Sequence, residues 1–286
     1  MNPALPSRSA VAVSLRRAAH QLIDRPLVFE DPIALQIIGR EVASAMQKAP
    51  ERFEGQVGAP TLRAFLAVRS RIAEDALAAA VAAGVRQYVV LGAGLDTFAY
   101  RNPWPELHVF EVDTPAMQDW KRLRLHETGI ATPASVSFVP VNFEQATLVD
   151  DLTRAGLDAE APTFFSWLGV MPYLTREAVV STLRLVAPLT RGGGGMAFDY
   201  VVPVESLNFF QRARFHVLAK RLADAGEPFQ SFFDPAVMRT LLESLGFTMV
   251  RDRGPDAINR KYFADRSDDL AVGEMGHVVT ASWSTE

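Results

Sequence analysis

A short apolar run followed by a glycine turn constrains this chain more than any other feature of its sequence. Residues Gln87–Leu91 read QYVVL, and Gly92-Ala93-Gly94 follow directly. An apolar run of this length is typical of a parallel strand that is buried on both faces. Glycines directly after such a strand let the backbone turn sharply and approach a ligand closely. The pattern predicts an α/β fold with a ligand bound at the end of this strand.

An acidic residue at a characteristic distance indicates that the ligand contains a ribose. Asp113 lies 21 residues after Gly92, just past the next strand candidate. A carboxylate at this place accepts hydrogen bonds from ribose hydroxyls. Glu111 precedes Asp113 by two residues and shares its face if the strand continues. The third glycine of the dinucleotide motif is missing, which favours an adenosyl ligand without phosphates over a dinucleotide.

Strand and helix candidates alternate along the rest of the chain. The further strand candidates are His108–Val112, Val136–Val141, Thr163–Leu168, Met196–Val201, Thr248–Val250 and His277–Ser282. The helix candidates are Ala64–Val81, Thr175–Val186, a segment from Asp234-Pro235 to Gly246, and a short helix that opens at Asp31-Pro32 and ends near Gly39. This alternation predicts βαβ units and a mostly parallel sheet in a single domain spanning residues 1–286.

Two segments lie outside the alternation. Residues 1–62 precede the first strand, and residues 203–235 form an insertion before the last helix. The insertion holds six of the chain's 18 phenylalanines within 25 residues, namely Phe209, Phe210, Phe215, Phe229, Phe232 and Phe233. We expect both segments to form a helical lid over the substrate; an ordinary helical core is the alternative for the insertion.

Composition excludes several classes of protein. A net charge of −4 and a pI near 5.8 argue against nucleic acid as a partner, because phosphate binding needs a concentrated basic face. The chain has no cysteine, so disulfides, thiolate metal sites and a cysteine nucleophile are excluded. The five histidines show no metal-ligand spacing, and we expect no metal. The first 21 residues lack the apolar core of a signal peptide, and no apolar run is long enough to span a membrane, so we expect a cytoplasmic protein.

The residues around the glycine turn resemble the leucine carboxyl methyltransferase family, and most of all its bacterial S-adenosylmethionine-dependent branch. The resemblance rests on Val89–Thr97 (VVLGAGLDT) with Arg101, and on Glu111–Pro115 (EVDTP). Shorter matches occur at Ser9-Ala10, Arg17-Ala18, Asp31–Ala34, Val68–Arg71, Gly84–Gln87, Gly169-Val170 and Tyr173-Leu174. The resemblance implies the class I methyltransferase fold, which is Rossmann-like with a seven-stranded sheet whose last strand is antiparallel. It also implies S-adenosylmethionine as cofactor and a carboxylate as methyl acceptor.

The resemblance also implies roles for individual residues. Gly92 and Gly94 would line the methionine and ribose, and Asp113 would hold the ribose. Asn142-Phe143 would flank the adenine, and Arg69 would hold the methionine carboxylate. At three positions the chain departs from the family's usual residues: Phe98 replaces an arginine, Asn142 an aspartate and Leu168 a glutamate.

Arg69 has support from its own helix. The apolar positions of the predicted helix define one face, and Arg69 falls on that face whereas Arg71 points away. A guanidinium on a core-facing position needs an anionic partner. That partner is either a ligand carboxylate or an aspartate or glutamate of the chain itself.

Aromatic residues near the strand ends are the candidates for the acceptor site. Trp167 and Tyr173 flank the end of the fourth strand, and Tyr200 lies at the end of the fifth. With Phe209 and Phe233 they are predicted to line the substrate, and a core role is the alternative. The sequence offers no evident acid–base pair apart from Tyr173 and Tyr200 as candidates.

A carboxylate acceptor fits this lack of a base, because its pKa near 4 leaves it ionised at neutral pH. The sequence therefore predicts an O-methyltransferase that converts a small, largely apolar carboxylic acid to a methyl ester. The alternatives are a non-catalytic S-adenosylmethionine-binding or interaction protein, an O-methyltransferase acting on a phenol, and a nicotinamide-dependent oxidoreductase. The sequence leaves the identity of the acceptor and the oligomeric state open.

Overall fold

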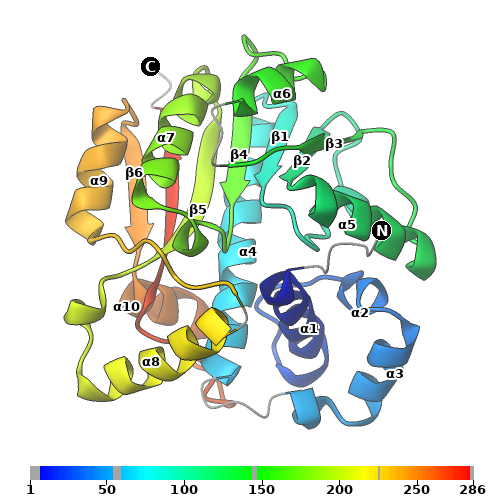
Figure 1. Cartoon of the computed structure of the whole chain (residues 1–286), viewed down its shortest axis with the longest axis vertical. Helices are drawn as coiled ribbons and strands as arrows, with labels where there is room; N and C mark the ends of the chain where they lie inside the picture. The colour runs from blue at the N-terminus through cyan, green and yellow to red at the C-terminus, as the bar shows by residue number, and fades with distance from the viewer. Residues whose placement is uncertain (1–6, 54–58, 144–146, 225, 284–286) are drawn as a thin grey trace.

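A seven-stranded sheet forms the centre of the computed structural model, which describes residues 7–53, 59–143, 147–224 and 226–283. The strand order is β3-β2-β1-β4-β5-β7-β6 (Figure 1). The strands are β1 Gln87–Leu91, β2 His108–Asp113, β3 Val136–Pro140, β4 Thr163–Trp167, β5 Gly195–Val201, β6 Met249–Arg253 and β7 Gly276–Ser282. The strand β7 is antiparallel to β5 and β6, and the other pairs are parallel. The predicted sheet, including its antiparallel last strand, is confirmed.

The order of the strands places a ligand site at one edge of this sheet. The strands β1, β2 and β3 run outward in chain order on one side, and the chain then returns to β4, which pairs in parallel with β1 and continues to β5 on the other side. In open α/β sheets, ligands bind outside the carboxyl ends of the strands at such a reversal. Gly92 follows β1, Asp113 ends β2 and Gly169 follows β4 by two residues, so the topology brings all three to this edge.

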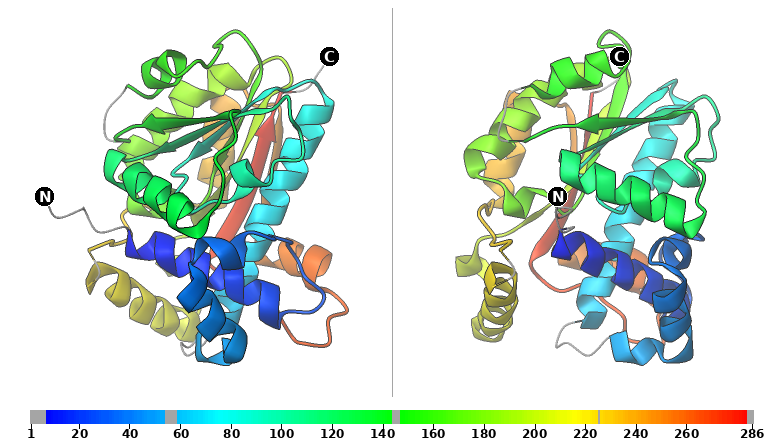
Figure 2. Two further views of the ribbon diagram at one scale, coloured as in Figure 1. Left: turned by 90° about the vertical axis from the view of Figure 1, so that its right-hand side faces the viewer. Right: turned by 45° about the vertical axis from the view of Figure 1, so that its right-hand side comes forward.

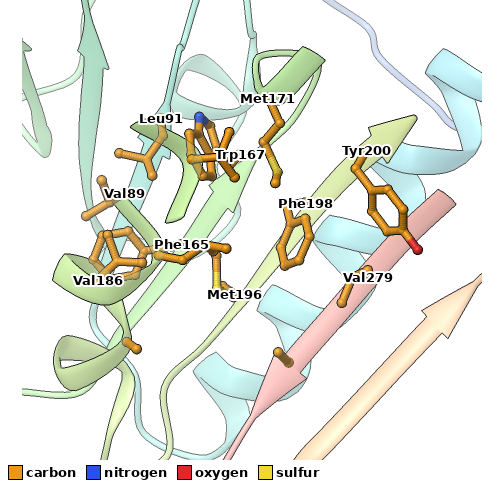
Figure 3. Close-up of a cluster of buried hydrophobic side chains, with 14 of the residues drawn as sticks. Val89, Leu91, Phe165, Trp167, Met171, Val186, Met196, Phe198, Tyr200 and Val279 are labelled. Atoms are coloured by element: carbon orange, nitrogen blue, oxygen red, sulfur yellow. The ribbon is translucent and has the colours of Figure 1, made fainter. Parts of the chain in front are cut away.

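Helices cover both faces of the sheet. On one face, α6 Leu148–Arg154, α7 Arg176–Val186 and α9 Pro235–Ser244 enclose the largest apolar cluster. Figure 3 shows its centre, where Phe165 of β4 lies beside Val186 of α7, and Phe198 of β5 lies toward Val279 of β7. On the other face, α4 Ala59–Ala82 and α5 Pro115–Thr128 pack against the sheet.

The remaining helices lie beyond the carboxyl edge. They are α1 Arg8–Ile23, α2 Ala34–Ile37, α3 Arg40–Lys48, and α8 Phe209–Asp224. Figures 1 and 2 show α1 and α8 at the end of the sheet toward which β4 and β5 point. Short helices of three to five residues complete the fold: η1 Pro50–Phe53, η2 Phe98–Tyr100, η3 Met171–Tyr173, η4 Ala187–Thr190, η5 Val204–Ser206, α10 Pro255–Ile258 and η6 Asn259–Phe263.

Capping residues explain where the helices begin. The side chain of Thr175 accepts a hydrogen bond from the backbone N–H of Ala178, and Asp234 does the same for Ala236 with Pro235 at the first helical position. These contacts satisfy backbone donors that have no partner within the helix. The predicted starts of α7 and α9 are therefore confirmed. The short helix expected after Asp31-Pro32 is α2.

Candidate active site

The turn after β1 has a backbone that requires glycine. Gly92 has φ +67°, and a Cβ there would lie 2.2 Å from the Cγ2 atom of Val170. Any other residue would therefore be strained and would clash with the segment after β4. The backbone N–H of Gly94 donates to Oδ2 of Asp113 at 2.7 Å. The turn is thus closed between β1, β2 and β4.

Asp113 holds this turn and retains capacity for a ligand. Its Oδ1 atom accepts from the backbone N–H of Thr114 at 2.7 Å, while Oδ2 accepts from Gly94. Each carboxylate oxygen has a further lone pair, so hydroxyl donors can still bind. Burial raises the pKa of Asp113, and the two backbone N–H groups oppose that rise.

Glu111 lies in the interior, although it shares the face of β2 with Asp113. Its Oε2 atom is 2.8 Å from Nζ of Lys121 and accepts from the hydroxyl of Tyr100 at 2.9 Å. Both Glu111 and Lys121 are almost completely buried. Glu111 therefore supports the site from within, and its carboxylate is engaged by two side chains of the protein.

Arg69 forms an ion pair inside the protein. Its Nη1 atom donates to Oδ2 of Asp199 at 3.0 Å, and Oδ1 of Asp199 accepts from the backbone N–H of Gly169 at 2.5 Å. Gly169 has φ +72°, and a Cβ there would lie 2.7 Å from the guanidinium of Arg69. Of the two partners that the sequence allows for Arg69, a ligand carboxylate or an acidic residue of the chain, the structure contains the second, Asp199. A contact of Arg69 with the methionine carboxylate stays a prediction.

The phase of α4 agrees with the expectation for Arg69 and Arg71. Arg69 is buried, whereas Arg71 is exposed and its Nε donates to Oδ1 of Asp75 at 2.8 Å.

The predicted adenine side lies after β3. Asn142 is exposed, and the ring of Phe143 stacks on Trp167 with centroids 6.3 Å apart. Trp167 is fully buried, and within the described ranges its indole N–H has no hydrogen-bond partner. Its ring lies beside Leu91 (Figure 3). Trp167 therefore belongs to the core beneath Phe143. Leu168 packs toward the other face, against the cluster that α4 buries.

A group of packed aromatic side chains, here called the aromatic wall, consists of Tyr173, Phe215, Phe229 and Phe232. The ring of Tyr173 lies 5.5 Å from that of Phe229. Phe229 in turn packs against Phe215 and Phe232, with centroids 5.9 and 6.2 Å away. These residues come from η3, α8 and the segment after α8, so part of the Phe-rich insertion does reach the strand ends.

Charged groups surround the hydroxyl of Tyr173. The charges of Glu227, Arg69 and Asp199 act on it. Burial raises the pKa of Tyr173, so the phenol is protonated at neutral pH. Burial lowers the pKa of the guanidinium of Arg16 on α1, which interacts with the same hydroxyl.

Three predicted substrate residues lie elsewhere. Tyr200 is buried, and its hydroxyl points toward β7 and β6 and donates to Oδ2 of Asp252 at 2.5 Å (Figure 3). Burial and Asp252 raise the pKa of Tyr200. Phe233 packs edge-on against Tyr200 in the core, and Phe209 is 78% exposed on α8. The structure therefore does not gather these three side chains into one pocket.

Sequence reasoning did not single out three charged residues of this region. Lys121 contacts Glu111, and Asp199 contacts Arg69; both partners were predicted to bind the cofactor. Glu227 contacts Ser9, which belongs to one of the short matches to the family. Asp199 carried one signal, its place at the end of a strand candidate. The positions of Lys121 and Glu227 showed no pattern that distinguishes them from surface charges.

Three further observations concern metal binding, membrane spans and surface hollows. Across the described part of the chain, no group of three or more His, Asp or Glu side chains could hold a metal ion. No helix among the described residues is both long and apolar enough to cross a membrane. A surface hollow of about 550 Å³ lies over α3 and η1, where it is lined by residues such as Arg40 and Arg52 and not by the residues of the carboxyl edge.

The geometry agrees with the comparisons to known proteins. Residues 10–187 match the family described as leucine carboxyl methyltransferase. The chain belongs to this family. A relative from Bacillus subtilis (strain 168), named as a candidate S-adenosyl-L-methionine-dependent methyltransferase, YktD, is 32% identical over 96% of this chain and 97% of its own. A relative of the same description from Saccharopolyspora erythraea is 33% identical over 69% of this chain and 68% of its own.

Solved structures share the fold. A candidate methyltransferase from Thermobifida fusca YX has a TM-score of 0.58 and 16% identity, covering 98% of this chain and 96% of that one. A DUF574 family protein from Streptomyces avermitilis has a TM-score of 0.55 and 19% identity, covering 94% and 97%. This family member is thus an S-adenosylmethionine-dependent methyltransferase of the α/β class, with S-adenosylmethionine as its cofactor.

Proposed function

We propose that this methyltransferase transfers the methyl group to a carboxylate oxygen of a small, largely apolar acid and forms a methyl ester. The observation that carries the proposal is that both carboxylates facing Tyr173 are engaged. Asp199 accepts from Arg69 and Gly169, and Glu227 accepts from Ser7 and Ser9. An acceptor that needs deprotonation would find no ready base there, whereas a carboxylic acid is already ionised at neutral pH.

The residues at the carboxyl edge fit the cofactor. Gly92 and Gly94 both have a positive φ, which favours glycine, and without side chains their backbone would let the methionine and ribose approach the turn closely. Asp113 would accept hydrogen bonds from the ribose hydroxyls, and Arg69, which also binds Asp199, would hold the methionine carboxylate. Asn142 and Phe143 would flank the adenine. When bound, S-adenosylmethionine supplies an electrophilic methyl group on a sulfonium.

Arg16 and the aromatic wall would orient the acceptor. Arg16 lies close enough to Tyr173 for the two groups to interact electrostatically, and its guanidinium would attract an acceptor carboxylate. Tyr173, Phe229 and Phe232 offer an apolar surface that excludes water from the reacting pair. Catalysis then comes from orientation and desolvation, of which orientation alone contributes up to about 7–11 kcal/mol. Such a wall favours apolar or aromatic acids over acids with further polar groups.

The chemistry of the product tests the proposal. The protein is incubated with methyl-labelled cofactor and a panel of carboxylic acids and phenols, and the product is then treated with alkali. A methyl ester releases its label as methanol, and this volatile label is the expected result. Label that stays on the product in alkali would refute carboxylate transfer and favour a phenol or amine acceptor.

Variants of α1 control this experiment. Arg16→Met should lower turnover of the acid about tenfold or more, because the charge that orients the acceptor is lost. Arg8→Met removes an exposed charge on the same helix and should leave turnover unchanged. Tight binding of S-adenosylhomocysteine by calorimetry with no turnover of any acceptor would instead support a non-catalytic binding protein.

A further inference from the structure

A buried ion pair lies beneath the glycine turn. Lys121 of α5 is 2% exposed and Glu111 of β2 is 1% exposed, and their Nζ and Oε2 atoms are 2.8 Å apart. Tyr100 of η2 donates to the same oxygen. The second oxygen of Glu111 has no hydrogen-bond partner among the residues that the structure describes. Replacing such a pair by apolar side chains is often neutral or stabilising, so stability alone is a poor reason for its presence.

The ammonium of Lys121 also contacts the turn itself. Its Nζ lies 3.5 Å from the backbone oxygen of Ala93, between the two glycines. The same oxygen accepts from the N–H of Asp96 at 2.7 Å, and the N–H of Ala93 donates to Val112 of β2 at 2.9 Å. A positive charge at this oxygen favours the conformation of the turn in which the N–H of Gly94 donates to Asp113.

Charges from several elements meet at this place. Asp113 ends β2, Asp96 follows the turn, and Arg17 of α1 and Arg101 after η2 act on Asp96. Lys121 acts on both aspartates. The other groups that face them are Glu111, Tyr100, Glu74, Arg122 and the N–H groups of Gly94 and Thr114.

We propose that Lys121 is a positioning residue for the cofactor: it supports the glycine turn from below and presents a positive charge to Asp113. Ribose hydroxyls then meet an ionised acceptor, which binds them more strongly than a neutral one. Burial raises the pKa of Asp113 and Lys121 opposes that rise, so cofactor binding weakens as the pH falls and Asp113 takes up a proton. This inference assumes that the site binds S-adenosylmethionine, and it does not depend on which molecule accepts the methyl group.

Titration of S-adenosylhomocysteine between pH 5 and 8.5 by calorimetry tests the proposal. Lys121→Met removes the positive charge, and the acid midpoint of binding should rise by about one pH unit. Glu111→Gln keeps the shape but leaves the charge of Lys121 unopposed, so the midpoint should fall. Arg124→Met removes a charge further along α5, where Arg124 pairs with Glu127, and should leave the midpoint unchanged. A role in packing alone would not produce opposite shifts in the first two variants.

A third variant separates positioning from folding. Tyr100→Phe/Glu111→Leu/Lys121→Met replaces the whole cluster by apolar side chains and should fold, as circular dichroism melting can verify. It should still bind S-adenosylhomocysteine about tenfold more weakly, because the contact of Lys121 with the backbone oxygen of Ala93 is lost. Its acid midpoint should shift less than that of Lys121→Met, because the opposing charge of Glu111 is removed as well. Wild-type affinity in this folded variant would overturn the proposal. Shifts of the same sign in Lys121→Met and Glu111→Gln would overturn it as well.

Discussion

The two segments outside the βαβ alternation are attached to the rest of the molecule in different ways. The N-terminal segment and the Phe-rich insertion look equivalent in the sequence, and both were expected to act as a lid. In the structure α1 is joined to the glycine turn by buried charges, whereas α8 presents apolar side chains to solvent. Position outside the sheet therefore says little about how firmly a segment is held.

Helix α1 is held through Arg17. Its guanidinium donates to Asp31 at 2.6 Å, to Thr97 at 2.8 Å and to Asp96 at 3.2 Å. Asp96 and Thr97 belong to the segment that follows the glycine turn. Apolar side chains of α1, α2, α3 and α5 pack around this network. Charges buried in this way are costly to separate, so α1 belongs to the frame of the site.

Helix α8 is held by its inner face and by one carboxylate beyond its end. Phe215 is buried, whereas Phe209, Phe210 and Val217 are 78%, 77% and 52% exposed. Glu227 links this segment to the start of α1, where Oε1 accepts from the hydroxyl of Ser7 at 2.6 Å and Oε2 from the N–H of Ser9 at 2.9 Å. We infer that α1 is fixed and that residues 209–224 and 226–233 are the part of the cover that moves.

The largest expected effect comes from breaking the frame. Arg17→Met leaves the buried carboxylate of Asp31 without its closest cation, and should lower the free energy of unfolding by about 3 kcal/mol or more. Urea denaturation measures this loss. Arg8→Met, on the exposed side of the same helix, should change stability by less than about 0.5 kcal/mol. Similar small losses in both variants would place α1 among the loosely held segments.

An intermediate effect is expected at the contact between the two segments. Glu227→Ala removes two hydrogen bonds to a charged group and, because the site is half-exposed, should cost about 1 kcal/mol. Hydrogen exchange should speed up in residues 209–233 and at the first turn of α1, but not in the rest of α1. Binding of S-adenosylhomocysteine to the wild type should slow exchange in 209–233 more than in 8–23. Glu205→Ala, an exposed carboxylate before α8, is the control.

The smallest effect is expected on the outer face of α8. Phe209→Ser should change the free energy of unfolding by less than about 0.5 kcal/mol, because the ring is exposed. The KM for the acid that the labelling experiment identifies should change less than about twofold. A tenfold rise in KM would mean that Phe209 closes onto the substrate, as the sequence had suggested, and would show a larger motion of α8.

Local patterns were sufficient to predict the parts of the site that adjoin strands. Gln87–Leu91 forms β1 with the predicted bounds, and Asp113 ends β2 within hydrogen-bond distance of Gly94. A buried strand needs an unbroken apolar run, and the turn after it needs glycine, so both are readable from neighbouring residues. The inward phase of Arg69 follows from helical periodicity in the same way.

Only the tertiary structure decided which charges pair. Arg69 and Asp199 are 130 positions apart, and Ser7 and Glu227 are 220 apart. Lys121 contacts Glu111 because α5 follows β2 directly along the chain and packs against the sheet. Periodicity shows that a charged side chain faces inward, but its partner depends on which strands become neighbours. The packing of the whole sheet determines which strands become neighbours and therefore which charged side chains can pair. Pairing is required wherever a charge is buried, because an unpaired buried charge is costly.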